Sequence, residues 1–164
     1  MMKKLINMNV NSKIVLRINK FLTNRPQYVK SFDTKSEVIT INTGAPQGCV
    51  LSFILFTLYT SDCRCQATNS LLFKYADDTA LVSLCVNNDS SYREEVQRFN
   101  TWCSEHYLEL NVMKTKEMVL DYSTSPVTQS PLYINGELVE SVTEYKYLGT
   151  IIDNKFCFNQ NAEA

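Results

Sequence analysis

The sequence predicts an α+β fold in which helices pack against a mainly antiparallel sheet. Three observations support this prediction. Residues 71–82 form an apolar, strand-forming run that is broken by Ala-Asp-Asp at 76–78. Asn135-Gly136 lies between short apolar segments and is the strongest short hairpin signal. Residues 12–23 instead repeat apolar residues at helical spacing.

Each expected element follows from local periodicity and turn residues. In chain order, these elements are a helix over 12–23, a hairpin of 27–32 with 37–41, a loop over 42–48, a helix over 50–60, the hairpin of 71–82, a helix after Ser91, a strand over 116–122, a hairpin over 132–139 and one strand over 145–152. The segment 50–60 is too uniformly apolar for a surface helix, so we expect it to be buried. We expect Phe56 to share a core with Leu72, Tyr75 and Leu81 of the hairpin.

The composition is that of an ordinary globular protein, with 45% hydrophobic and 20% charged residues among 164. The chain is long enough for one domain with a core. It contains neither an apolar stretch of 18 residues nor the pattern of a signal peptide, which predicts an intracellular protein without a membrane partner. The oligomeric state cannot be predicted.

The six cysteines are scattered through predicted strands and helices, which favours reduced thiols over a disulfide framework. A zinc site built from Cys63, Cys65, Cys103 and His106 is the sharper alternative, although the first spacing is short for such a site. His106 is the single histidine of the chain. We expect it to pack at a helix end.

Charge is distributed unevenly along the chain. Residues 1–35 carry eight Lys or Arg and one acid, Asp33, for a net charge of +7, whereas the remainder sums to −8. A basic segment before an acidic body is typical of a phosphate-facing arm. A solvated basic helix face explains the same residues equally well.

Asp77 and Asp78 are the residues whose placement costs the most folding free energy, because two adjacent charges interrupt an apolar run. Aspartate tolerates the backbone angles of tight turns, so both carboxylates are expected at the tip of a buried hairpin. Adjacent like charges stay ionised where cations are close, and Mg²⁺ prefers carboxylates together with substrate phosphates. Ordinary turn chemistry remains the alternative for such a short motif.

The motifs are more specific as an ordered set. They are Gly-Ala-Pro-Gln-Gly-Cys-Val-Leu-Ser at 44–52, Leu-Phe-Thr-Leu-Tyr at 55–59, Tyr-Ala-Asp-Asp-Thr at 75–79, Leu-Asn-Val-Met-Lys-Thr-Lys at 110–116 and Tyr-Leu-Gly at 147–149. With this set, nearly the whole chain resembles the reverse transcriptase of LINE-type, non-LTR retrotransposons.

The resemblance implies the palm of a right-hand polymerase without its fingers. Residues 1–149 would form a partial palm, and residues 150–164 the start of a thumb or a frayed tail. The implied reaction transfers a deoxynucleotide to a primer 3′-hydroxyl with two Mg²⁺ ions, or Mn²⁺ in their place. The implied partners are an RNA template, a DNA primer and deoxynucleoside triphosphates.

The resemblance also assigns roles to individual residues. The catalytic residues would be Asp77, Asp78 and Lys114, with both aspartates as metal ligands; the substrate-binding residues would be Gly44, Pro46, Gln47, Gly48, Tyr75 and Ala76; the primer grip would be Tyr147, Leu148 and Gly149. Glycines allow close backbone approach, Gln47 offers a donor and an acceptor, and the Lys114 ammonium could serve the leaving pyrophosphate. Plain loop glycines, a surface amide and a solvated lysine are the alternatives.

Two departures from the family pattern affect these expectations. Phe53 occupies a position where the family usually has proline, which is preorganised at a first helical position, so we expect a looser entry to the helix. The family's other metal-binding aspartate is expected upstream of Met1, because Asp33 lacks the apolar strand context of that residue. The chain alone is therefore expected to be inactive.

Two other functional classes remain open at this point. The first is a truncated, non-catalytic module that binds nucleic acid or another protein. The second is the palm of an RNA-templated RNA polymerase, which fits residues 44–52 less well.

Overall fold

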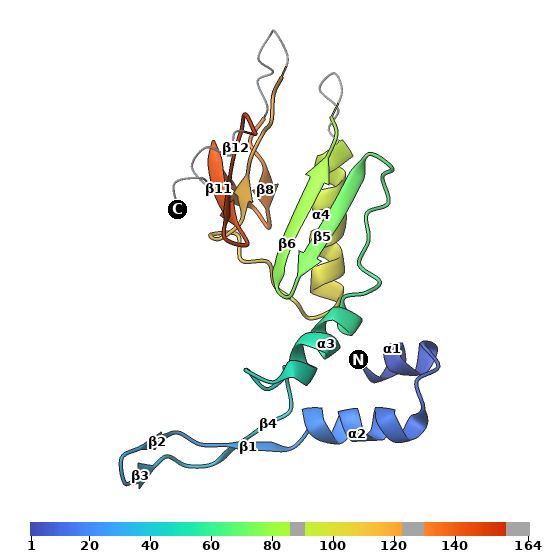
Figure 1. The fold of residues 1–164 in the computed structure, drawn as a ribbon, viewed down its shortest axis with the longest axis vertical. Coiled ribbons are helices and arrows are strands. Elements are labelled where there is room, and N and C mark those ends of the chain that lie inside the picture. The colour runs from blue at the N-terminus through green and yellow to red at the C-terminus, as the bar shows by residue number, and fades with distance from the viewer. Residues whose placement is uncertain (86–90, 123–129, 157–164) are drawn as a thin grey trace. The chain divides into compact units, whose positions relative to one another are not determined.

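The computed structural model describes residues 1–85, 91–122 and 130–156. Helices and short, mostly antiparallel strand pairs make up these ranges, which confirms the predicted α+β class (Figure 1). The chain divides into two compact units, Met1–Asp62 and Cys63–Ala164. We describe each unit by itself.

The N-terminal unit contains three helices and two short strand pairs. Its elements are α1 (Met2–Asn7), α2 (Ser12–Leu22), β1 (Arg25–Gln27), β2 (Lys30–Ser31), β3 (Thr34–Lys35), β4 (Ile39–Ile41) and α3 (Val50–Tyr59). Leu5, Ile18 and Leu55 come from the three helices and form the buried core of this unit. The helix predicted over residues 12–23 is thus confirmed as α2, and Ile18 lies on its predicted apolar side.

The helix α3 differs from prediction in two ways. Its uniform hydrophobicity predicted burial, but only Leu55 is buried, whereas Val50 is 80% exposed and Phe53 is 49% exposed. A single apolar side is enough to fill the small core of this unit. The helix also begins at Val50, which makes Phe53 its fourth residue. The argument about a first helical position therefore does not apply to Phe53.

The hairpin predicted from residues 27–32 and 37–41 is present with a shifted register. β1 pairs antiparallel with β4, and β2 pairs with β3 farther along the same hairpin. Two hydrogen bonds link these strand pairs. The Ser36 backbone N–H donates to the Val29 carbonyl, and the Val29 backbone N–H donates to the Ser36 hydroxyl oxygen, each with an N to O distance of 2.9 Å. The result is a long, narrow hairpin in this unit.

The C-terminal unit is built around one long helix and several short hairpins. Its elements are β5 (Ser70–Tyr75), β6 (Asp78–Ser83), α4 (Ser91–Glu105), β7 (Lys116–Glu117), β8 (Tyr133–Ile134), β9 (Glu137–Leu138), β10 (Glu140–Ser141), β11 (Glu144–Tyr147) and β12 (Thr150–Asp153). Val112, Leu132, Ile134 and Val139 form its buried apolar cluster, against which Val96 of α4 packs. His106 follows α4 and stacks on Trp102 at 4.1 Å between ring centroids, as expected for a residue that packs at a helix end.

The described strands form six separate two-stranded sheets, whereas we expected one continuous, mainly antiparallel sheet. Five pairs are antiparallel, and β7 pairs with β10 in parallel. The strand predicted over 116–122 is limited to Lys116–Glu117, because its partner β10 offers only two residues.

The segment 145–152 is a hairpin, whereas its sequence predicts one strand. Leu148 and Gly149 have φ values of 48° and 91° and reverse the chain between β11 and β12. Asn135 and Gly136 do the same between β8 and β9, with φ values of 53° and 82°. Positive φ at both central residues is typical of type I′ hairpin turns, so the prediction at Asn135-Gly136 is confirmed.

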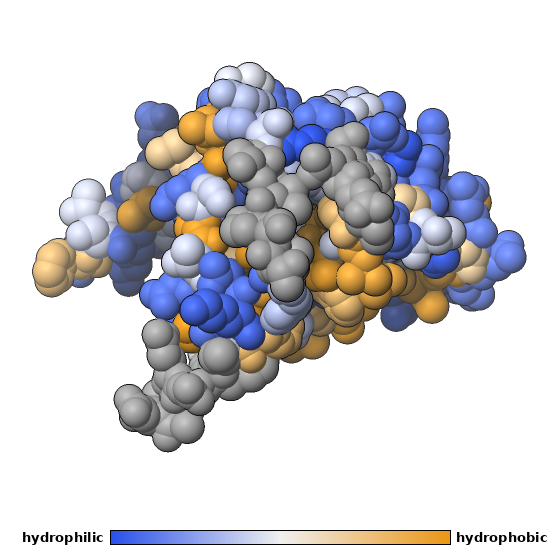
Figure 2. Space-filling view, turned by 90° about the horizontal axis from the view of Figure 1, so that it is seen from above, coloured by the Kyte–Doolittle hydropathy of each residue, from blue (hydrophilic) through white to orange (hydrophobic). Residues whose placement is uncertain are grey.

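Large apolar side chains reach the surface in both units, and hydrophobic residues lie among polar ones in the space-filling view (Figure 2). No helix within the described ranges has the length and apolar content needed to cross a membrane.

Candidate active site

The paired aspartates lie at the two-residue turn that joins β5 and β6. Figure 1 shows these two strands side by side. Tyr75 pairs with Asp78, which leaves Ala76 and Asp77 as the turn. The sequence predicts that aspartate adopts the unusual backbone angle, but Ala76 is the residue with a positive φ, 52°. The turn therefore places one carboxylate in the loop and the next at the start of β6.

Both carboxylates are exposed to solvent. In the described part of the chain, no hydrogen bond or ion pair engages either of them. Exposed oxygen donors that are not used inside the protein suit a hard cation such as Mg²⁺, which completes its coordination with water and phosphate oxygens. The donor set of Asp77 and Asp78 thus fits such an ion. Within the same ranges, no group of three or more His, Cys, Asp or Glu side chains is placed to hold a metal.

The hairpin is not buried as predicted, because one of its two faces is open. Cross-strand pairing puts Leu71, Phe73 and Tyr75 on the same face as Asp78. These three side chains are 61%, 51% and 59% exposed. Tyr75 is therefore not the core residue that we had expected. Its side chain is exposed to solvent, which is compatible with the predicted role in binding substrate.

The opposite face of the hairpin is covered more closely. Leu72 and Leu81 are half-buried partners on this face, and Lys74 donates to the Cys63 carbonyl at 3.0 Å. Phe56, in the N-terminal unit, is also half-buried. None of the four residues expected to form a shared core is fully buried.

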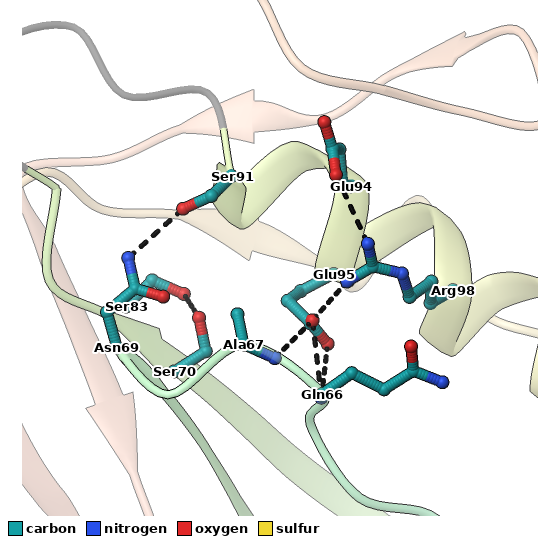
Figure 3. A network of polar contacts seen from close by, with 9 residues as sticks. All are labelled: Gln66, Ala67, Asn69, Ser70, Ser83, Ser91, Glu94, Glu95 and Arg98. Carbon is teal, nitrogen blue, oxygen red and sulfur yellow. Dashed lines mark hydrogen bonds and ion pairs between the residues drawn. The ribbon is translucent and has the colours of Figure 1, made fainter.

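The base of the hairpin is held by a polar network with Glu95 of α4 (Figure 3). Its carboxylate accepts hydrogen bonds from the backbone N–H groups of Ala67 at 2.8 Å and Gln66 at 3.2 Å. Arg98 pairs with the same carboxylate and also with Glu94. Glu95 is only 2% exposed. The network therefore fixes the segment that leads into β5.

Burial alone would raise the pKa of Glu95. The hydrogen bonds from Ala67 and Gln66 and the charge of Arg98 outweigh that effect, so the pKa is lowered. Sequence reasoning missed Glu95, which resembles any polar residue of a helix. Its position one turn before Arg98 was the only available signal.

A second set of contacts closes the hairpin base. The Asn69 amide donates to the Leu84 carbonyl at 2.9 Å and to the Ser91 hydroxyl at 3.1 Å. The hydroxyls of Ser70 and Ser83 hydrogen-bond across the strands at 2.7 Å (Figure 3). Both ends of the hairpin are therefore tied to each other and to the start of α4.

Tyr147, predicted for the primer grip, lies within electrostatic range of Asp78. Partial burial, the charge of Asp78 and Tyr145 together raise the pKa of the Tyr147 phenol. Leu148 and Gly149 follow in the exposed turn of the β11–β12 hairpin. The charge of Asp78 therefore acts on the phenol of one predicted primer-grip residue.

Lys114 lies in the turn that precedes β7, and it is exposed. Its backbone N–H donates to the Asn111 carbonyl at 3.1 Å and to the Asn111 side chain at 3.2 Å. These contacts fix the turn and leave the ammonium at the surface.

The glycine loop of residues 44–48 belongs to the N-terminal unit. Gly44 and Gly48 have φ values of 65° and 71°, a backbone conformation that favours glycine. An added Cβ would meet no atom within 4 Å at either position, so the backbone angle and not a lack of space favours glycine there. Gln47 is exposed, and the Pro46 carbonyl accepts a hydrogen bond from Ser52 of α3.

Arg25 of β1 holds this loop, a role that sequence reasoning missed. Its guanidinium donates to the carbonyls of Thr43 and Gly44, the latter at 3.0 Å. From the sequence alone, Arg25 counts among the basic residues of 1–35 that were expected to face phosphate. The structure uses it to fix the loop instead.

Two of the cysteines proposed as zinc ligands, Cys63 and Cys103, interact electrostatically. Cys63 and Cys103 are both buried, and burial together with Cys63 raises the pKa of Cys103 to about 11. In the described part of the chain, no three of Cys63, Cys65, Cys103 and His106 come together as metal ligands.

Comparison with known proteins places these observations in a family. The description "reverse transcriptase (RNA-dependent DNA polymerase)" belongs to the family pattern that matches residues 1–152. A probable RNA-directed DNA polymerase from transposon BS of Drosophila melanogaster is 29% identical over 158 residues, or 90% of this chain. The RNA-directed DNA polymerases from mobile element jockey of Drosophila funebris and Drosophila melanogaster are 30% and 27% identical over 88% and 91% of this chain.

The chain spans 17% of the length of each of these three relatives. No solved structure matches it significantly. The family pattern nevertheless covers all of the motifs from Gly44 to Gly149, and the matches confirm the resemblance that these motifs indicated. The chain belongs to the reverse transcriptase (RNA-dependent DNA polymerase) family.

Proposed function

We propose that residues 1–149 are part of the palm domain of a right-hand polymerase, with the start of the thumb in residues 150–164. The whole protein would add deoxynucleotides to a DNA primer along an RNA template. The observation that carries this proposal is the exposed Asp77-Asp78 pair at the β5–β6 turn, which the rest of the described chain leaves available.

Asp77 and Asp78 would hold Mg²⁺, or Mn²⁺ in its place. An ion bound there would neutralise the triphosphate and lower the pKa of the primer hydroxyl. The primer 3′-oxygen forms a bond to the α-phosphorus, the bond to the pyrophosphate oxygen breaks, and the hydroxyl proton passes to solvent. This chemistry explains why two carboxylates remain exposed and adjacent.

Other residues would position the reactants. The Lys114 ammonium would neutralise or protonate the departing pyrophosphate. Gly44, Pro46, Gln47 and Gly48 would line the nucleotide and template, together with Tyr75 and Ala76. Tyr147, Leu148 and Gly149 would hold the primer end, and the electrostatic proximity of Tyr147 to Asp78 supports this role.

The 164-residue chain by itself would not sustain turnover. Two carboxylates on one hairpin hold one ion loosely, whereas in-line transfer uses two ions about 3.5–4 Å apart. A further carboxylate from another strand is needed to fix that spacing. The test is primer extension by this chain and by a longer protein that contains the whole polymerase region. Robust extension by the chain alone would contradict this part of the proposal.

The metal site can be tested without turnover. We expect Asp77→Asn to weaken Mn²⁺ binding at least about tenfold in an electron paramagnetic resonance titration, because an anionic carboxylate ligand becomes a neutral amide. Asp33→Asn is the matched control, since Asp33 is also the second residue of a two-residue hairpin turn. Equal Mn²⁺ affinity in both variants would overturn the metal site.

A further inference from the structure

The tip of the β2–β3 hairpin concentrates features that are unfavourable for stability. Phe32 is 94% exposed and has a φ of 50°, a value rarely adopted by a bulky residue. Ser31 and Thr34 pair on either side, so Phe32 and Asp33 form the two-residue turn. The turn therefore presents an aromatic ring fully to solvent on a backbone that glycine would adopt more easily.

Two lysines face each other just behind this ring. Lys30 and Lys35 are direct cross-strand partners, and both are exposed. Like charges directly opposite each other destabilise a strand pair. Within the described ranges, no ion pair engages either lysine. The arrangement costs stability in the free chain and is relieved by an anion.

Tyr28 orders one of these cations. The Lys35 ammonium lies 5.2 Å from the centroid of the Tyr28 ring, within the range of a cation–π interaction. This contact holds Lys35 beside Lys30 despite their repulsion. The hairpin thus offers two positive charges one residue pair behind the turn that carries the exposed ring, and Tyr28 holds one of them.

We propose that the β2–β3 tip binds single-stranded nucleic acid, with a base stacked on Phe32 and a phosphate held by Lys30 and Lys35. Each nucleotide combines a planar face with a nearby anion, and proteins that bind single strands pair aromatic rings with basic grooves. The net charge of +7 over residues 1–35 favours such a polyanion. An apolar protein surface explains the ring but not the paired lysines.

This proposal does not depend on the aspartate site. The assay is fluorescence anisotropy with a labelled oligothymidine, in EDTA and without nucleotide, so that no metal contributes. We expect Phe32→Ala to weaken binding by about fivefold or more, and Phe32→Trp to retain it. Phe32→Leu should bind as weakly as the alanine variant, because stacking needs a planar ring.

The chain offers a close control. Tyr107 in the C-terminal unit is 95% exposed and has a φ of 55°, so Tyr107→Ala removes an equally exposed ring from a similar backbone conformation. It should change the affinity less than twofold. The combined variant Lys30→Gln and Lys35→Gln should weaken binding and lower the salt slope by about 0.7 for each phosphate that it no longer neutralises.

Several outcomes would overturn the proposal. One is unchanged oligothymidine binding in Phe32→Ala when circular dichroism shows a folded chain. Another is wild-type binding by Phe32→Leu, which would indicate apolar contact rather than stacking. A third is stronger association of the wild type with vesicles of anionic phospholipid than with the oligonucleotide, lost in Phe32→Ala, which would assign the tip to a membrane surface.

Discussion

Glu95 of α4 accepts a 2.8 Å hydrogen bond from the backbone N–H of Ala67, three residues before β5 begins. This contact ties the helix to the segment that enters the aspartate hairpin. The open face of that hairpin carries exposed apolar side chains, so packing contributes little on that side. The polar contacts at its base are therefore expected to matter for its stability.

The first prediction is that Glu95→Ala destabilises the chain by about 2–3 kcal/mol, because two backbone donors and the Arg98 side chain lose their buried acceptor. Urea denaturation at neutral pH measures this change. Glu94→Ala is the matched control, since Glu94 pairs with the same Arg98 but is exposed. It should cost no more than about 0.5 kcal/mol. Similar losses in both variants would show that the base network does not stabilise the fold.

The second prediction concerns pH. The folded-state pKa of Glu95 lies below its ordinary value of 4.5. The unfolded chain thus takes up the proton first as pH falls, so the contribution of Glu95 to stability is fully present above that value. It is lost as pH falls through the lower, folded-state pKa. Denaturation series across this acidic range should show a smaller decline for Glu95→Gln than for the wild type. Parallel declines would contradict the lowered pKa.

The third prediction tests the turn between β5 and β6, beside Asp77 and Asp78. Ala76 has a φ of 52°, where a Cβ is strained by about 1–2 kcal/mol. Ala76→Gly relieves this strain at a smaller entropic cost, so the free energy of unfolding should rise by roughly 0.5 kcal/mol. Ala80→Gly, in the middle of β6, should instead lower it by about 0.5–1 kcal/mol. Loss of stability in both variants would mean that the turn is not strained.

The fourth prediction concerns the basic helix α2. Lys13, Arg17 and Lys20 recur at helical spacing and are exposed, and the acidic remainder of the chain repels phosphate. Replacing all three with glutamine should weaken binding to a primer–template duplex and reduce its salt dependence.

The matching control for α2 neutralises three exposed cations of the C-terminal unit, Arg64, Lys146 and Lys155. Filter binding at several salt concentrations compares the two triple variants. Unchanged duplex affinity at low salt after neutralisation of α2 would exclude this helix as the phosphate-facing surface.

The fifth prediction separates the two neighbouring residues of α3. Leu55 is 2% exposed and packs with Leu5 and Ile18, whereas Phe56 is half-buried. Leu55→Ala should cost about 2–5 kcal/mol and Phe56→Ala clearly less, although the phenyl ring is larger. Thermal unfolding of the two variants gives the comparison. A larger loss for Phe56→Ala would place the core on the other side of the helix.

The sequence alone was sufficient for the features that depend on neighbouring residues. Asn135-Gly136 and the Ala-Asp-Asp break predicted hairpin turns, because a two-residue turn is specified by the backbone preferences of the residues within it. The helix α2 followed from apolar spacing over eleven residues. The ordered motifs from Gly44 to Gly149 were specific enough to indicate the reverse transcriptase family.

Tertiary structure alone decided which faces are covered and which polar groups are paired. The apolar pattern of β5 and α3 predicted burial, but exposure depends on whether a distant segment lies against each face, and local periodicity carries no such information. Glu95 became a buried acceptor only because the backbone of residues 66–67 lies against α4. Arg25 and Phe32 also depend on tertiary contacts that the sequence does not show. The Arg25 guanidinium binds the Gly44 carbonyl within its own unit. The Phe32 ring stays in solvent, because no distant segment of the described chain covers it.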